Sequence, residues 1–222
     1  MSERSETASV STFRQSEPVL ETQAMVRARL TSDQSLAVFR SVLDAASRPG
    51  TLVPLPDGTA PGVPSAIVPV LALADLDVAV ATLDDADGSP WSSLIRSVTG
   101  CRTAAADEAD MVVALRLPTI DEIRSLRTGT DHAPERGARL FIACGAIRSG
   151  RHDGGTAIRM RGPGASDGRT ITVDGIAAEL FGALVTANRS FPAGVDTWLV
   201  AESRDMVGIP RSTQIDVIEG ER

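Results

Sequence analysis

Arginine dominates the chemistry that this sequence offers. The chain has 222 residues, and all 22 of its basic residues are Arg because it contains no Lys. A guanidinium stays protonated at working pH and does not act as an amine nucleophile. A Schiff base with pyridoxal phosphate or with a carbonyl substrate is therefore excluded, and so is a Walker A lysine over a triphosphate.

Few residues can act as general bases. The sequence has no Tyr, and its only His and Cys residues are His132, His152, Cys101 and Cys144. The candidate bases are therefore mainly carboxylates. Because these four residues show no C-x-x-C or H-x-x-x-H spacing, we expect no zinc site, and the sequence predicts neither a metal nor a cofactor.

Two arginines precede a glycine turn. Arg159 and Arg161 are two residues apart, so both project from one face of an expected strand over 156–161. They lead into Gly162 and Gly164, where backbone amides can approach an anion. Paired guanidiniums can hold a phosphate, a phosphonate or a partner's carboxylate in a bidentate manner. The alternative is an ordinary solvated strand face.

The stretch from Gly164 to Gly168 matches the G-x-S-x-G nucleophile elbow of esterases. An elbow requires a helix after the Ser, but 169–173 has the pattern of a strand. Both His residues also precede Ser166, whereas the hydrolase order places the His after it. We therefore interpret this stretch as a tight turn.

A further candidate segment runs from 187 to 196, between an expected helix and a buried strand. One interpretation is a helix end and turn, with Asn188 tolerating left-handed geometry and Asp196 accepting hydrogen bonds from loop amides. The other is a docking edge or ligand loop, because Arg189 and Asp196 place charges beside the sheet.

These residues need a scaffold, and the hydrophobic pattern predicts one of α/β type. Apolar spacing predicts helices over 32–47, 65–73, 91–98, 120–126 and 176–187, the first capped by Ser32 or Asp33 and stopped by Arg48-Pro49-Gly50. Strands are expected at 51–55, 78–83, 111–117, 140–147, 197–201 and 206–209, with a hairpin of 156–161 and 169–173 joined by a loop over 162–168. Alternation of strands and helices predicts a mixed, mostly parallel sheet covered by helices on both faces.

Composition limits the cellular context. Hydrophobic residues make up 42% of the chain, and 29 acidic residues against 22 basic ones give a net charge of −7, which disfavours nucleic-acid and anionic-membrane partners. Residues 1–20 are polar and lack a signal-like apolar stretch, so we expect a disordered tail and a cytoplasmic protein. One α/β domain is expected over 21–218, with a short tail over 219–222.

Five short motifs together resemble a known family. In order and spacing they are similar to the PhnH family, a component of the bacterial carbon-phosphorus lyase system, and the resemblance covers about residues 32–217. The motifs are 39–50, Thr128-Gly129-Thr130 with Pro134-Glu135, Gly162-Pro163-Gly164, 191–196 and Ile209-Pro210-Arg211-Ser212-Thr213.

The resemblance implies a fold, partners and a role. The fold would be a three-layer α/β/α sandwich, similar to the large domain of PLP-dependent transferases but without a PLP site. The partners would be subunits G, I and J and a second copy in a homodimer. The role would be that of an accessory subunit, needed while the complex transfers the triphosphoribosyl group of ATP to a phosphonate. No catalytic residue is carried over from the family.

The sequence also departs from the family pattern. Ser97-Val98-Thr99 stands where the family is expected to have Phe-His-Thr, which lowers the expectation of acid–base catalysis on that helix. The rival hypothesis is a stand-alone transferase that binds a phosphonate or a nucleotide phosphate in an arginine-lined site. Both hypotheses place the same residues at a ligand site or interface: Arg48, Arg161, Gly162, Gly164, Arg189, Asp196 and Arg211.

Overall fold

The computed structural model describes residues 26–84 and 90–218. The expected tails at 1–20 and 219–222 lie outside these residues. Among the helices of the described part, none is long and apolar enough to span a bilayer.

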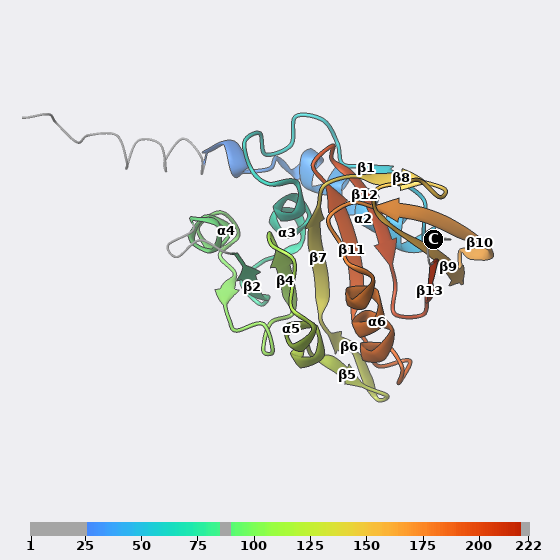
Figure 1. Cartoon of the computed structure of the whole chain (residues 1–222). Helices are drawn as coiled ribbons and strands as arrows, with labels where there is room; N and C mark the ends of the chain where they lie inside the picture. Colours follow the sequence, from blue (N-terminus) through green and yellow to red (C-terminus); the bar gives the residue numbers. More distant parts are fainter. Residues whose placement is uncertain (1–25, 85–89, 219–222) are drawn as a thin grey trace, which may run out of the picture.

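A central sheet of seven strands organises the molecule (Figure 1). Its spatial order is β1-β12-β11-β7-β4-β2-β3. Strands β3, β2, β4, β7 and β11 run parallel, whereas β12 and β1 continue the sheet in antiparallel fashion. The predicted mixed, mostly parallel sheet is thereby confirmed. The strands are β1 (Val53–Pro54), β2 (Ala79–Leu83), β3 (Arg102–Thr103), β4 (Met111–Ala114), β7 (Arg139–Cys144), β11 (Asp196–Ala201) and β12 (Asp205–Ile209).

Alternating side chains divide the buried residues between the two faces of this sheet. On β7, Phe141 points into one core while Leu140 and Ile142 point into the other. Strands β4 and β11 show the same alternation, so both faces are apolar. This explains why the strands read as nearly continuous hydrophobic runs.

Helices α2 (Ser32–Ser47), α3 (Val68–Leu73) and α4 (Trp91–Thr99) cover one face, together with the 3-10 helix η1 (Ser65–Ile67). Helix α2 begins at a capping box in which the Thr31 hydroxyl accepts from Gln34 N and the Gln34 side chain accepts from Thr31 N. The predicted N-caps, Ser32 and Asp33, were therefore wrong by one or two positions.

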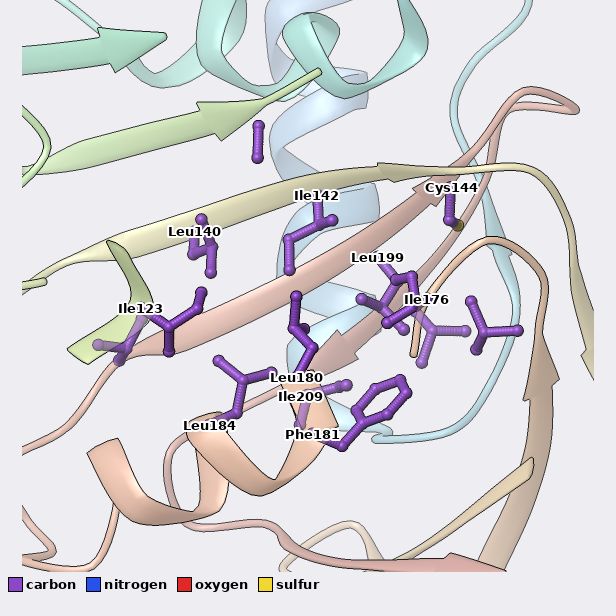
Figure 2. Close-up of a cluster of buried hydrophobic side chains, with 14 of the residues drawn as sticks. Ile123, Leu140, Ile142, Cys144, Ile176, Leu180, Phe181, Leu184, Leu199 and Ile209 are labelled. Carbon is purple, nitrogen blue, oxygen red and sulfur yellow. The ribbon is translucent and has the colours of Figure 1, made fainter. Parts of the chain in front are cut away.

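Helices α5 (Ile120–Ser125) and α6 (Ala178–Ala187) cover the opposite face. Figure 2 shows Leu180, Phe181 and Leu184 of α6 on the same side of the central sheet as Leu140 of β7 and Leu199 of β11, and all five are buried in one cluster. Helices on both faces were predicted, but α6 shares its layer with a second sheet. The outer layer on this side is therefore not purely helical.

This second sheet has the order β13-β9-β10-β8. It contains the predicted hairpin, but the turn is two residues, Pro163-Gly164, instead of the predicted loop over 162–168. A register shift between Ala165 and Arg169 accommodates the extra polar residues. The G-x-S-x-G match lies in this turn and strand, so no elbow forms. The strands are β8 (Ile147–Ser149), β9 (Thr156–Gly162), β10 (Ala165–Val173) and β13 (Gln214–Ile218).

The apolar run over 140–147 was predicted as one central strand, and this was wrong. Strand β7 ends at Cys144, and Ile147 begins β8 in the second sheet. Both parts are apolar because Leu140, Ile142 and Ile147 belong to the same core. A small third sheet pairs β5 (Thr128–Thr130) with β6 (Ala133–Gly137).

Candidate functional site

The most extensively bonded charge pair of the predicted site joins Asp196 and Arg211. Asp196 is the first residue of β11, and Arg211 follows β12. Arg211 donates from its backbone N and its Nε to Asp196 Oδ1, at 2.9 and 3.1 Å, and from Nη2 to Oδ2 at 2.6 Å. Its Nη1 donates to the carbonyl of Pro134. The Arg211 side chain is only 13% exposed, so this pairing fixes its position.

Close backbone packing surrounds this pair. A Cβ on Gly137 would lie 2.2 Å from Gly194 O and 2.7 Å from Arg211 Nη1. A side chain at position 137 would therefore displace the guanidinium from Asp196. Gly137 is required here because of close approach, not because of its backbone angles.

The loop after α6, residues 188–195, is anchored by hydrogen bonds at both ends. The Asn188 side chain accepts from Val195 N at 2.7 Å and donates to Val195 O at 3.2 Å, and Gly194 N donates to Thr128 O at 2.7 Å. Asn188 has φ −96°, so the predicted left-handed geometry was wrong. Asp196 accepts a hydrogen bond from a loop amide as expected, but this amide is Arg211 N, in the segment after β12.

This anchored loop presents two large side chains to solvent. Arg189 is exposed, and Phe191 is 63% exposed despite being large and apolar. Phe191 precedes Pro192 through a cis peptide bond. An exposed arginine and an exposed phenylalanine on a fixed loop are the residue types that anchor protein–protein interfaces.

Both residues line an open groove of about 630 Å³. One wall is the end of α6, and the other is the first half of β13, which Figure 1 shows beside that helix. The segment between β12 and β13 forms part of the lining. The lining residues are Pro163, Val185, Asn188, Arg189, Phe191, Arg211, Ser212, Thr213, Gln214, Ile215 and Asp216.

Arg161 reaches the same groove through an ion pair. Its Nη2 lies 2.5 Å from Asp216 Oδ2, and the two side chains are 48% and 53% exposed. Arg159 is also exposed, whereas Ile158 and Met160 are buried. The prediction that both arginines share the solvent face of one strand is thereby confirmed.

The hairpin turn next to the groove presses against the end of α2. Gly164 has φ +78°, and a Cβ there would lie 2.1 Å from Ser47 O. Gly162, on the groove side, would place a Cβ 3.1 Å from Ser212 O. Arg48 caps α2 and pairs with Asp44 one turn earlier, on the surface.

The structure thus brings five of the seven predicted residues around one groove, and it places the other two where the hairpin turn meets the end of α2. The five are Arg161, Gly162, Arg189, Asp196 and Arg211; the other two are Arg48 and Gly164. Their functional roles remain predictions.

Most of the charges around the groove are paired with one another. Three arginines face two aspartates here, although the whole chain carries −7. Each aspartate forms an ion pair with a guanidinium. The surface suits recognition of a carboxylate or another oxyanion. Within the described residues, no group of three or more His, Cys, Asp or Glu side chains is arranged to hold a metal ion.

Sequence reasoning missed one wall of the groove. Strand β13 was not predicted, and Asp216 was therefore not considered. A weak signal existed, because Ile215 and Val217 alternate with polar residues. The alternation is weak since β13 is an edge strand whose residues are all at least partly exposed.

Comparison with known proteins matches the chain to one family over most of its length. The family profile described as bacterial phosphonate metabolism protein (PhnH) matches residues 28–216. HtxG of Stutzerimonas stutzeri, provisionally named as a C-P lyase subunit, is 32% identical over 81% of this chain and 84% of its own length. The PhnH subunit of alpha-D-ribose 1-methylphosphonate 5-triphosphate synthase from Rhizobium meliloti is 28% identical over 82% of this chain and 90% of its own. The matched range contains the residues of the groove, and this chain belongs to the PhnH family of bacterial phosphonate metabolism proteins.

Proposed function

We propose that this chain is an accessory subunit of a carbon-phosphorus lyase complex in phosphonate catabolism, with no reaction of its own. Membership of the PhnH family carries the proposal, and the two relatives are themselves named as subunits. The ion pairs of the groove support it, because both of its aspartates are already engaged by guanidiniums in the folded chain.

We further propose that the groove binds a neighbouring subunit. Arg189 and Phe191 are exposed on a loop that hydrogen bonds hold in place, so little conformational entropy would be lost on binding. The expected partners are subunits G, I and J in the cytoplasm, and a homodimer is expected in their absence. We also propose that the fold is similar to that of the large domain of PLP-dependent transferases.

Co-expression with subunits G, I and J, followed by size-exclusion chromatography, tests the groove. The wild-type chain should co-elute with its partners. Arg189→Glu and Phe191→Asp should each weaken co-elution, since one reverses a charge and the other removes an apolar anchor. Both positions are exposed, so the variants should fold normally, which circular dichroism would check.

Matched controls lie on other surfaces. Arg40→Glu on α2 and Leu76→Asp before β2 make the same chemical changes at exposed positions away from the groove, and should leave co-elution intact. Equal effects of the groove and control variants would contradict the proposed interface. Failure of the wild-type chain to co-elute would contradict the accessory role itself.

The net positive charge of the groove favours one second candidate, a stand-alone transferase that binds a phosphonate or a nucleotide phosphate. Titration of the isolated chain with methylphosphonate and with ATP, followed by ³¹P NMR, would separate the two. The accessory role predicts no turnover of either compound by the chain alone. Turnover that is lost in Arg161→Ala would establish the second candidate instead.

A further inference from the structure

The groove runs along the free edge of a β-strand. Strand β13 lies at one end of the second sheet and pairs only with β9 among the described residues. Three of its consecutive residues, 214–216, line the groove. Because consecutive residues of a strand point to opposite faces of the sheet, a groove that contacts all three follows the backbone edge and not one face. The groove therefore lies beside the unpaired N–H and C=O groups of this edge.

The end of α6 forms the facing wall of the groove. Val185 lies in the last turn of the helix, and Asn188 and Arg189 follow three and four residues later, so that all three line the groove. Figure 1 shows α6 next to β13. A slot between an edge strand and a helix suits an extended segment, which adds to the sheet as one more strand. Main-chain hydrogen bonds then hold the segment, and pockets receive its alternate side chains.

Strand β13 lacks the features that usually protect the edge of a sheet. It contains no Pro, and its register with β9 runs without a bulge over all five residues. Its one charged side chain, Asp216, is engaged by Arg161 of β9. Within the described part of the chain, no backbone group outside β9 bonds to residues 214–218. The edge is therefore open to a strand from another molecule.

The groove leaves one of its charges unpaired. Two of its three arginines are held by aspartates, whereas Arg189 makes no ion pair within the described residues. Its side chain is exposed, so it is accessible to a binding partner. A guanidinium binds a carboxylate through two parallel hydrogen bonds. The charge of the groove therefore favours a segment that contains an acidic residue.

Apolar side chains flank this arginine. Val185 and Phe191 are exposed and Ile215 of β13 is partly buried, and all three line the groove. Covering such apolar surface is favourable because it is removed from water. The side chains of an extended segment alternate between two sides, so one of them can cover this apolar surface while the backbone pairs with the edge.

We infer that the groove binds an extended, acidic segment of a neighbouring subunit, which pairs with β13 as a fifth strand of the second sheet. A carboxylate of the segment pairs with Arg189, and an apolar side chain covers Val185 and Phe191. This edge pairing rests on the proposed accessory role, because the segment belongs to a partner subunit.

Hydrogen–deuterium exchange of the full-length chain, alone and in complex with subunits G, I and J, tests edge pairing. In the free chain, alternate amides of 214–218 should exchange fast because they point away from β9. In the complex, these amides should exchange at least about tenfold more slowly, because they donate hydrogen bonds to the segment. Strand β8 is the matched control: it forms the other edge of the same sheet, and its outward amides should keep their exchange rates.

A substitution on α6 tests the side-chain contacts. Val185→Asp removes an apolar contact and repels the carboxylate of the segment. It should therefore lower the affinity for the purified complex of G, I and J at least about tenfold, measured by calorimetric titration, and abolish the slowing of exchange in β13. Leu117→Asp makes the same kind of change at an equally exposed position between β4 and α5, and should leave both unchanged. Circular dichroism checks that both variants fold.

The outcomes separate edge pairing from the accessory role. If the wild-type chain co-elutes with G, I and J but exchange in β13 does not slow, or slows equally in β8, edge pairing is wrong and the accessory role stands. Equal effects of Val185→Asp and Leu117→Asp would also contradict edge pairing. If every amide of β13 exchanges slowly in the chain alone, a second copy or the chain's own residues occupy the edge, and edge pairing with a partner is again wrong. Failure of the wild-type chain to co-elute would overturn both.

Discussion

At the scale of single residues, the groove depends on how deeply each charge pair is buried. Arg211 and Asp196 are 13% and 26% exposed, whereas Arg161 and Asp216 are about half exposed. Water screens the second pair far more than the first. The two pairs therefore provide a matched comparison within one site.

Arg211→Met should lower the free energy of unfolding by about 2–3 kcal/mol, because it leaves the partly buried Asp196 without its guanidinium. Arg161→Met should lower it by less than about 1 kcal/mol, as expected for an exposed pair. Urea unfolding followed by circular dichroism measures both. Similar losses of unfolding free energy in the two variants would show that burial does not decide how much these ion pairs contribute to stability.

Another residue-scale prediction concerns pH. The Arg116 guanidinium lowers the pKa of Glu122 to about 2, against an ordinary value of 4.5, and the hydrogen bond from Thr119 N acts in the same direction. A carboxylate whose pKa falls on folding stabilises the folded state above its unfolded pKa. That stabilisation is lost as pH falls through the folded value.

The wild-type chain should therefore lose stability relative to Glu122→Gln as pH falls from about 4.5 to about 2. Gln preserves the capping position at the start of α5, so the comparison isolates the charge. Urea unfolding of both chains over this pH range provides the measurement. If the stability difference between the wild-type chain and Glu122→Gln stays constant over this pH range, folding does not lower the pKa of Glu122.

At the scale of elements, the hairpin turn illustrates a requirement for glycine. Gly164 combines a left-handed φ of +78° with a backbone oxygen, Ser47 O, 2.1 Å from where a Cβ would lie. Gly58 has a similar φ of +70° but no atom within 4 Å of that place. Strain acts at both positions, whereas the clash acts at only one.

Gly164→Ala should destabilise the chain by at least about 3 kcal/mol, because the hairpin has to move away from α2. Gly58→Ala should cost only about 1–2 kcal/mol, from backbone strain alone. Thermal unfolding of the two variants tests the difference. Equal losses would mean that the hairpin does not press on α2 in solution.

Local signals predicted most elements of the fold. The periodicity of 32–47, with Arg48-Pro49-Gly50 after it, predicted α2 to within one or two residues, and the predicted helix at 91–98 forms as Trp91–Thr99. The predictions failed where contacts between residues far apart in the sequence decide the bounds of an element. The run over 140–147 is apolar throughout, so nothing local shows that β7 stops at Cys144 and that Ile147 belongs to another sheet.

The candidate site was predictable as a set of residues but not as a groove. Arg189 and Asp196 were identified from their charge and from the density of Gly and Pro around them, and Arg211 was identified from the motif Ile209-Pro210-Arg211-Ser212-Thr213. Their common location depends on β13, whose sparse apolar residues gave too little signal. The order of the strands in the central sheet, which decides which residues meet at its ends, is not revealed by the sequence alone.

At the scale of the whole molecule, the absence of Lys separates this chain from enzymes that use pyridoxal phosphate. Even if the fold proves similar to the large domain of such transferases, no side-chain amine is available to form an internal aldimine. Adding pyridoxal phosphate should therefore give no stable aldimine absorbance. A stable band that survives gel filtration would contradict this expectation.

The accessory role is also a whole-molecule claim, and reconstitution tests it most directly. Subunits G, I and J would be incubated with methylphosphonate and ATP, with and without this chain, and alpha-D-ribose 1-methylphosphonate 5-triphosphate would be measured by mass spectrometry. The account predicts product only when this chain is present with its partners, and none from the chain alone. Product formation by the chain alone, or undiminished formation by the partners without it, would contradict the account.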